Sequence, residues 1–200
     1  MEVLAPPPRF LSREKAVELE AAAARVDRAE GRAPGEPGLL LAVVLGIACG
    51  GRAGEPAQLR REELRLREEH PYLTIRRDEV RRSKTYAERS VPLSRSDAER
   101  LRELGADRGE GPVFPSEREA RGEYLRANTL GRRLALARPI LGEHVDFYDL
   151  RHTFASWHVQ AGVSIAKVAR WLGNTVAVCE RHYAALSPGG DPDASRRDAA

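Results

Sequence analysis

The sequence predicts an α+β fold in a single domain, mainly helical with a small antiparallel β-sheet. Its 200 residues suit one large domain with a sizeable core. Apolar residues make up 42% of the chain and charged residues 32%, as in folded globular proteins rather than disordered or membrane-spanning ones. Helical signals dominate the chain, and a short stretch of alternating residues interrupts them between positions 71 and 93.

A leader and one helix are expected at the N-terminus. Residues 1–9 include three consecutive prolines and predict a flexible leader. Ser12 can cap a helix that runs to about Glu30, because its hydroxyl can accept a backbone N–H from the first turn. The glycine- and proline-rich stretch from Gly31 to Gly38 ends this helix.

A buried helix and a small sheet are expected next. The apolar run from Leu39 to Cys49 lacks alternation and exceeds the usual strand length, so it predicts a buried helix that ends at Gly50. A further short helix is expected from Ala57 to Leu64. The alternating segment Pro71–Arg77 and the extended piece Ser90–Leu93 predict an antiparallel hairpin or a three-stranded ribbon.

Helical signals return after Ser94 and continue almost to the C-terminus. Gly162 and Gly173 are expected to end two of these helices, because glycine readily adopts the left-handed conformation of a helix end. Residues 187–200 are rich in Pro, Gly and Asp and predict a disordered tail. The predicted helices are Asp97–Leu104, Thr129–Ala137, Leu150–Ala161, Ile165–Leu172 and Val176–Leu186.

Composition and cysteine content narrow the class of protein. No apolar run reaches the roughly 20 residues of a membrane-spanning helix, so a cytoplasmic protein without a membrane partner is expected. Cys49 and Cys179 cannot form a disulfide framework or a four-ligand zinc site, and both lie in apolar segments. We expect neither a metal nor a cofactor, because no residue cluster has metal-site spacing and no glycine-rich phosphate loop is present.

Four separated segments carry residue types suited to phosphate chemistry. Arg52 follows the predicted buried helix in the string Gly-Gly-Arg-Ala-Gly-Glu. Lys84, one of only three lysines, lies in the polar connection of the predicted hairpin. Arg151 lies in the string Asp-Leu-Arg-His-Thr-Phe-Ala. Asn174 ends a Leu-Gly-Asn step, and Tyr183 follows it after a further short helical segment.

In this order and spacing the segments resemble the catalytic domain of tyrosine recombinases and phage-type integrases. The resemblance covers residues 10–186 and implies a mainly helical domain that acts on double-stranded DNA. Most such integrases carry a helical core-binding domain before the catalytic one. Since Met1 stands only about ten residues ahead of the first matching segment, that domain is expected to be absent. Members of the family act as tetramers on DNA, and a lone domain is expected to be monomeric when free.

The resemblance implies site-specific recombination, such as integration or excision of a mobile element, through a 3′-phosphotyrosyl intermediate. Arg52 and Arg151 would clamp the phosphate with planar, permanently charged donors. Tyr183 would attack the phosphate and form the covalent link. Lys84 matches the lysine that protonates the leaving 5′ oxygen. Glu55 matches an acidic position that helps to orient the first arginine.

Two positions depart from the family pattern. Tyr148 stands where the family commonly has histidine, and Asn174 where it has histidine or tryptophan. Tyr148 is a poor proton shuttle at neutral pH, and Asn174 cannot titrate. Loss of a proton-transfer partner lowers a rate by about 10²- to 10⁴-fold. The chain is therefore a slow enzyme, an enzyme in which His152 or His182 substitutes, or an inactive remnant.

Structural interpretations compete with two of these assignments. Arg151 lies among apolar neighbours on a predicted helix, where an unpaired cation is unfavourable. It therefore requires an ion pair with Asp149 or Asp146, or a bound phosphate. Tyr183 could simply pack against the core from an amphipathic helix, as most isolated tyrosines do.

Two regions could contact DNA without taking part in catalysis. Basic residues of the predicted hairpin form either a phosphate-contacting arm or an ordinary solvated turn, because acidic neighbours offset half of them. Residues 160–172 resemble a helix-turn-helix, so a non-catalytic DNA-binding module is the alternative function. The candidate arm residues are Arg76, Arg77, Arg81, Arg82 and Arg89.

Overall fold

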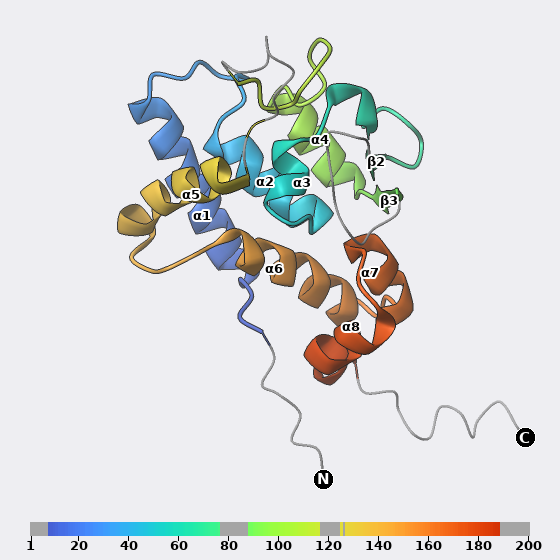
Figure 1. Cartoon of the computed structure of the whole chain (residues 1–200). Helices are drawn as coiled ribbons and strands as arrows, with labels where there is room; N and C mark the ends of the chain where they lie inside the picture. The colour runs from blue at the N-terminus through green and yellow to red at the C-terminus, as the bar shows by residue number, and fades with distance from the viewer. Residues whose placement is uncertain (1–7, 77–87, 117–124, 126, 189–200) are drawn as a thin grey trace, which may run out of the picture.

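Eight α-helices and a small three-stranded sheet make up the part of the chain that the computed structural model describes, residues 8–76, 88–116, 125 and 127–188 (Figure 1). The predicted mainly helical α+β fold is confirmed. No helix within these ranges is long and apolar enough to cross a membrane. Cys49 and Cys179 are buried free thiols, and burial raises the pKa of Cys49 to about 11.

The first two helices form as the sequence predicts. Helix α1 (Arg13–Ala29) begins after Ser12, whose hydroxyl accepts the backbone N–H of Lys15 at 3.1 Å. Helix α2 (Leu39–Cys49) is buried along almost its whole length. The carboxylate of Asp27, in the last turn of α1, accepts the first two backbone N–H groups of α2 at 2.6 and 2.8 Å, which joins the end of α1 to the start of α2.

The predicted helix over Ala57–Leu64 is wrong. A short helix α3 (Gly54–Ala57) lies earlier, and a 3₁₀ turn η1 (Arg61–Glu63) follows it. Between them the chain pairs with a distant segment, through a bridge between Arg60 and Pro112 and a bond from the N–H of Arg61 to the carbonyl of Gly111 at 2.8 Å. This tertiary pairing replaces the local helical bonds.

The sheet is a three-stranded antiparallel ribbon in the order β1 (Leu64–Arg65), β2 (Tyr72–Ile75) and β3 (Arg89–Pro92). In its register Leu73 lies opposite Val91, and both side chains are fully buried. Of the two predicted arrangements, a hairpin or a three-stranded ribbon, the ribbon is confirmed.

The remaining helices lie close to their predicted positions. Asp146 starts α6 three residues early, because its carboxylate accepts the N–H groups of Tyr148 and Asp149. Gly162 and Gly173, with φ of +82° and +65°, follow the ends of two helices as predicted. These elements are α4 (Arg95–Glu103), α5 (Ala127–Leu141), α6 (Phe147–Gln160), α7 (Ile165–Leu172), α8 (Val176–Tyr183) and the 3₁₀ turn η3 (Ala184–Leu186).

Helix α6 connects the helices around α2 with the C-terminal helices α7 and α8. Its first turns pack on α2, which also packs against α1, α4 and α5. Its later turns pack on α7 and α8, at the lower right of Figure 1. Helix α7 also contacts β3. The ends of α2 and α7 therefore meet beside α6, and the candidate residues lie at this junction.

Candidate active site

The turn after α2 holds Arg52 at the junction. Gly50 ends α2 with φ +59°, and a Cβ there would lie 2.5 Å from Phe154 and 2.9 Å from Leu172, so only glycine fits. The backbone N–H of Arg52 donates to Glu55 Oε2 at 2.7 Å. This bond closes the turn between α2 and α3. The Arg52 side chain is half-buried.

Arg151 on α6 is buried, with 3% of its surface exposed. Its Nη1 and Nη2 groups donate to the carbonyls of Gly50 at 2.8 Å and Leu172 at 3.0 Å. Of the two predicted partners, the ion pair with Asp146 or Asp149 is wrong, because these two aspartates form the capping box of α6. The alternative, a bound phosphate, stays a prediction. Burial, followed by the charge of Arg52, lowers the pKa of Arg151, but a guanidinium stays ionised at neutral pH.

Tyr183 ends α8 and points into the junction, with 2% of its surface exposed. Its hydroxyl lies 2.7 Å from Nδ1 of His152 on α6. Burial raises the pKa of Tyr183 to about 12, and the positive charge of Arg151 only partly offsets this rise. The arrangement combines a buried phenol, an imidazole and a buried cation.

His152 is set up to be neutral near pH 7. Burial, then the charges of His182 and Arg151, lower its pKa below the ordinary value of 6.5. The rings of Tyr148, His182 and Tyr183 surround it, with centroids at 6.0, 6.3 and 5.9 Å. A neutral imidazole beside a phenol is able to accept its proton.

The two positions that depart from the family pattern lie in different surroundings. Asn174 follows α7, and its Oδ1 accepts from Arg52 Nη2 at 3.1 Å. Burial raises the pKa of the nearby Cys179 thiol, and Arg151 and Asn174 partly offset this rise. Tyr148 lies in the first turn of α6 and is 59% exposed. Asn174 is therefore part of the junction, whereas Tyr148 stands at its rim.

Glu55 and Arg89 form a buried ion pair next to the Arg52 turn. Arg89 Nη1 and Nη2 donate to Glu55 Oε1 and Oε2, both at 2.8 Å, and Arg89 Nε donates to the carbonyl of Trp171 at 2.7 Å. The expectation that Arg89 belongs to an exposed DNA-contacting arm is corrected, because only 8% of its surface is exposed. On β3 it shares the inward face with Val91.

The other predicted arm residues are placed only in part. Arg76 lies after β2 and is exposed, with its Nε 3.8 Å from Glu88 Oε2. Lys84 and three of the predicted arm arginines lie outside the described residues, namely Arg77, Arg81 and Arg82.

One group of described residues has the donor types of a metal site. His144, Asp146 and Asp149 bring possible ligand atoms within 4.8 Å of one another. However, Asp146 and Asp149 already accept the backbone N–H groups at the start of α6, and Arg9 forms a 4.0 Å ion pair with Asp149. Capping of α6 therefore accounts for the two carboxylates of this group.

The sequence does not predict the carbonyl acceptors that hold Arg89 and Arg151 inside the junction. The carbonyls of Gly50, Trp171 and Leu172 are backbone groups, and no residue pattern identifies them. The sequence does indicate that Arg89 points inward. On an extended segment Arg89 and the apolar Val91 lie on one face, and Ser90 lies on the other.

Solved structures of recombinases and integrases share the fold. The chain matches XerA recombinase with a TM-score of 0.65 and 22% identity, over 97% of this chain and 65% of that one. It matches the catalytic domain of bacteriophage HP1 integrase with a TM-score of 0.63 and 21% identity, over 94% of both chains. A lambda integrase tetramer bound to a Holliday junction matches with a TM-score of 0.58 and 19% identity, over 92% of this chain and 50% of that one.

These likenesses define the fold as that of a tyrosine-recombinase catalytic domain. The chain belongs to the phage integrase family, whose model matches residues 10–188. It spans less than two thirds of the XerA recombinase chain. No curated protein sequence matches it.

Proposed function

We propose that the chain cuts and rejoins DNA at specific sites through a 3′-phosphotyrosyl intermediate. One observation carries the proposal: the Tyr183 hydroxyl lies 2.7 Å from His152 Nδ1, beside the buried guanidinium of Arg151. A nucleophile, a proton acceptor and a fixed positive charge are the parts that metal-free phosphodiester cleavage requires. Membership of the phage integrase family supports the same chemistry.

Arg52 and Arg151 would bind the non-bridging oxygens of the scissile phosphate. Two bonds to carbonyls use two of the five N–H donors of Arg151 and fix the plane of its guanidinium. Arg52 reaches the same junction from the turn after α2, and its side chain binds Asn174 there. Charge that is fixed before the reaction stabilises the transition state without reorganisation.

Proton transfer from Tyr183 must accompany its attack. With a pKa of about 12, only about one phenol in 10⁵ is ionised at pH 7. His152 accepts the proton at Nδ1 as the phenol oxygen bonds to phosphorus, which requires the neutral tautomer that carries hydrogen on Nε2. His152 therefore takes over the proton-transfer role that Tyr148 cannot perform.

The leaving group completes the cleavage step. The P–O5′ bond breaks, and the 5′ oxygen takes a proton from Lys84, the family's matching lysine, to leave as a hydroxyl. Tyr148 and Asn174 act as uncharged hydrogen-bonding groups around the phosphate. In the reverse step a 5′ hydroxyl attacks the phosphotyrosine and gives its proton to Lys84, the Tyr183–phosphorus bond breaks, and the released phenolate takes its proton back from His152. The energy of the phosphodiester is conserved.

The partner in this proposal is double-stranded DNA. Solved structures with the same fold include a lambda integrase dimer bound to a core site and a tetramer bound to a Holliday junction. We accordingly propose that four copies assemble on two DNA duplexes, whereas the free chain is monomeric.

A covalent-trapping assay tests the proposal. The protein is incubated with nicked and intact DNA that carries the sequences flanking its own gene, and SDS-resistant adducts are separated by gel electrophoresis. Wild-type protein is expected to form an adduct, and Tyr183→Phe is expected to form none. Tyr72→Phe, on β2, is the matched control and should behave like the wild type.

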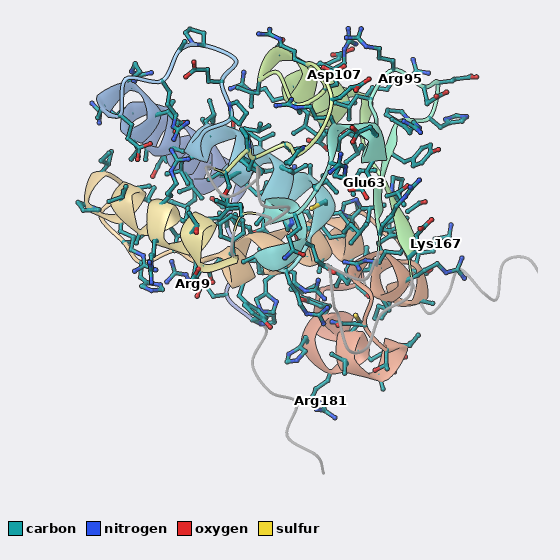
Figure 2. All side chains as sticks on the ribbon, turned by 45° about the horizontal axis from the view of Figure 1, so that its top comes forward. Arg9, Glu63, Arg95, Asp107, Lys167 and Arg181 are labelled. Carbon is teal, nitrogen blue, oxygen red and sulfur yellow. The ribbon has the colours of Figure 1, made fainter. Side chains whose placement is uncertain are left out.

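A second candidate function is binding of DNA without cleavage. Helices α6 and α7 and the turn between them have the order of a helix-turn-helix, and the exposed face of α7 carries Lys167 and Arg170. Lys167 points away from the body of the molecule (Figure 2). A hollow of about 540 Å³ lies beside them. If the chain only binds DNA, the wild type and Tyr183→Phe should shift DNA equally well in a gel-shift assay. The wild type should then form no covalent adduct.

A further inference from the structure

We propose that Arg89 is a positioning residue of the cleavage site: it holds Glu55 and the end of α7, and through both it fixes Arg52. The inference rests on the proposed function, in which Arg52 binds the scissile phosphate. It gives a role to an arginine that the sequence alone assigns to the DNA-contacting arm.

The guanidinium of Arg89 acts as a three-point brace. Two of its nitrogens bind the two carboxylate oxygens of Glu55 at 2.8 Å, and the third, Nε, binds the carbonyl of Trp171 at 2.7 Å. Bidentate pairs of this kind are short, directional and stronger than neutral hydrogen bonds. The brace therefore sets the position of α3, which carries Glu55, relative to α7 and β3.

The first route from Arg89 to Arg52 runs through Glu55. Its Oε2 atom accepts from Arg89 Nη2 at 2.8 Å and from the backbone N–H of Arg52 at 2.7 Å. One oxygen is thus shared between the brace and the turn that carries the phosphate ligand. If the carboxylate rotates, the backbone of Arg52 loses its acceptor.

The second route runs through the end of α7. Arg89 binds the carbonyl of Trp171, and three residues later Asn174 binds the Arg52 side chain at 3.1 Å. The carbonyls at a helix C-terminus carry partial negative charge and favour a nearby cation. Arg89 therefore supports both the backbone and the side chain of Arg52.

Arg151 forms a parallel brace on the next carbonyl. It joins Leu172 to Gly50, while Arg89 joins Trp171 to Glu55. Two buried arginines thus tie consecutive carbonyls of α7 to the two ends of the turn that holds Arg52. In the proposed reaction Arg151 also contacts phosphate, whereas Arg89 acts only through its partners.

Burial and charge argue against a phosphate contact by Arg89. Only 8% of its surface is exposed, and both oxygens of Glu55 are bound to it. Burial opposes ionisation of Glu55 most strongly, but the bonds and charge of Arg89 and the Arg52 N–H together outweigh it, so its pKa stays below the ordinary value. The Arg89 charge is thus matched inside the protein. Arg76, by contrast, is exposed.

The geometry requires arginine rather than any cation. A lysine ammonium is a single point of charge and cannot bind both carboxylate oxygens and the Trp171 carbonyl with the same planar fork. Arg89→Lys keeps the buried charge and so avoids leaving Glu55 unpaired, while it removes the fixed geometry. It is therefore the informative variant, and Arg89→Met and Glu55→Gln are the stronger companions.

The experiment has a readout that needs no DNA. Hydrogen exchange of the Arg52 backbone N–H is measured by NMR in the free protein, together with amides in the middle of α2. In Arg89→Lys the Arg52 amide should exchange about 10-fold faster or more, the effect of weakening one hydrogen bond to a charged group. The α2 amides should change far less.

A matched control separates positioning from general stability. Arg133 on α5 binds Asp27 and Glu30 at 3.1 and 2.5 Å, at the other end of α2. Arg133→Lys also removes a largely buried arginine fork, and it should leave Arg52 exchange unchanged. An unchanged Arg52 amide in both Arg89→Lys and Glu55→Gln would overturn the proposal.

DNA measurements test the consequence for the site. With the DNA that gives the wild-type adduct, Arg89→Lys should lower the rate of adduct formation by about 10²-fold, as a displacement near 1 Å does. The dependence of DNA affinity on salt should stay as in the wild type. A salt slope lower by about one would mean a direct phosphate contact and would overturn the inference. If the wild type forms no adduct, the proposed function fails, while Arg52 exchange still decides the role of Arg89.

Discussion

The clamp side and the nucleophile side of the site are built differently. On the clamp side, Arg52, Arg89 and Arg151 are held by carbonyls, by Glu55 and by Asn174, so their charges are fixed before any DNA arrives. On the nucleophile side, Tyr183 is buried among rings, and one hydrogen bond to His152 holds its hydroxyl. The first region holds its guanidinium groups in place within the protein, whereas the second holds a buried, protonated phenol.

In the proposed function, this difference separates the binding of DNA from its cleavage. A preformed cluster of positive charge attracts phosphate at any sequence. Cleavage needs more, because Tyr183, with its pKa of about 12, must lose its proton and come within bonding distance of phosphorus. In the proposed reaction, changes on the nucleophile side should therefore affect cleavage more than binding.

The largest effect is expected from Arg151→Lys, on the clamp side. A lysine cannot bind the carbonyls of Gly50 and Leu172 and a phosphate in one plane, so adduct formation should fall by about 10³-fold. The unfolding free energy should also fall by about 1–3 kcal/mol, because a buried carbonyl is left unsatisfied. Denaturant titration and the trapping assay measure the two effects.

Arg181→Lys is the control for this variant. Arg181 lies on α8 with its side chain pointing away from the body of the molecule (Figure 2). It should change neither the rate nor the stability by a measurable amount. An Arg151→Lys variant within tenfold of the wild-type rate would show that the clamp is not preformed as described.

The next largest effect is expected from His152→Asn, on the nucleophile side. Loss of the proton acceptor should slow adduct formation by about 10²-fold, the lower end of the range for general acid–base catalysis, with DNA affinity nearly unchanged. His182→Asn distinguishes between the two histidines, and it should slow the reaction less than tenfold because no described contact joins its ring to the Tyr183 hydroxyl. Equal losses of rate in His152→Asn and His182→Asn would show that His152 is not the specific acceptor of the Tyr183 proton.

Most of the helices could be predicted because their signals are local. Ser12, Gly50 and Gly173 mark helix ends through caps that depend on neighbouring residues alone. The segment Ala57–Leu64 could not be predicted, because its conformation follows from pairing with residues 111–113. Local reasoning fails where a distant segment of the chain supplies the hydrogen bonds.

The site divides in the same way. The string around Arg151 and the spacing to Tyr183 identify the family, and the structure brings both residues to one junction with Arg52. The contact between His152 and Tyr183 depends on how α6 and α8 pack, and sequence spacing does not give it. The burial of Arg89 follows from which face of β3 is turned inward, and its charge obscured that signal.

The pH dependence of cleavage is expected to report on the nucleophile side. His152 accepts a proton only when neutral, and its pKa is lowered from the ordinary value of 6.5, so the rate of adduct formation should fall as the pH decreases through this lowered pKa. The same lowered pKa means that the unfolded chain binds the proton first, so the folded state should also lose stability below pH 6.5. In His152→Asn this acid limb should disappear, and its persistence would point to another base.

The smallest effects are expected at Tyr148, on the rim of the nucleophile side. Because 59% of its surface is exposed, its hydroxyl can donate to phosphate only in competition with water. Tyr148→Phe should therefore slow adduct formation by less than about tenfold, the range of one exposed neutral hydrogen bond.

Tyr148→His restores the residue that the family commonly has. The Tyr183 hydroxyl lies 2.7 Å from His152 Nδ1, which indicates that His152 already takes the Tyr183 proton. Tyr148→His should therefore raise the rate only slightly when made in the wild type. When made in His152→Asn, it should raise the rate clearly. A large gain in the wild type would show instead that His152 does not carry the proton.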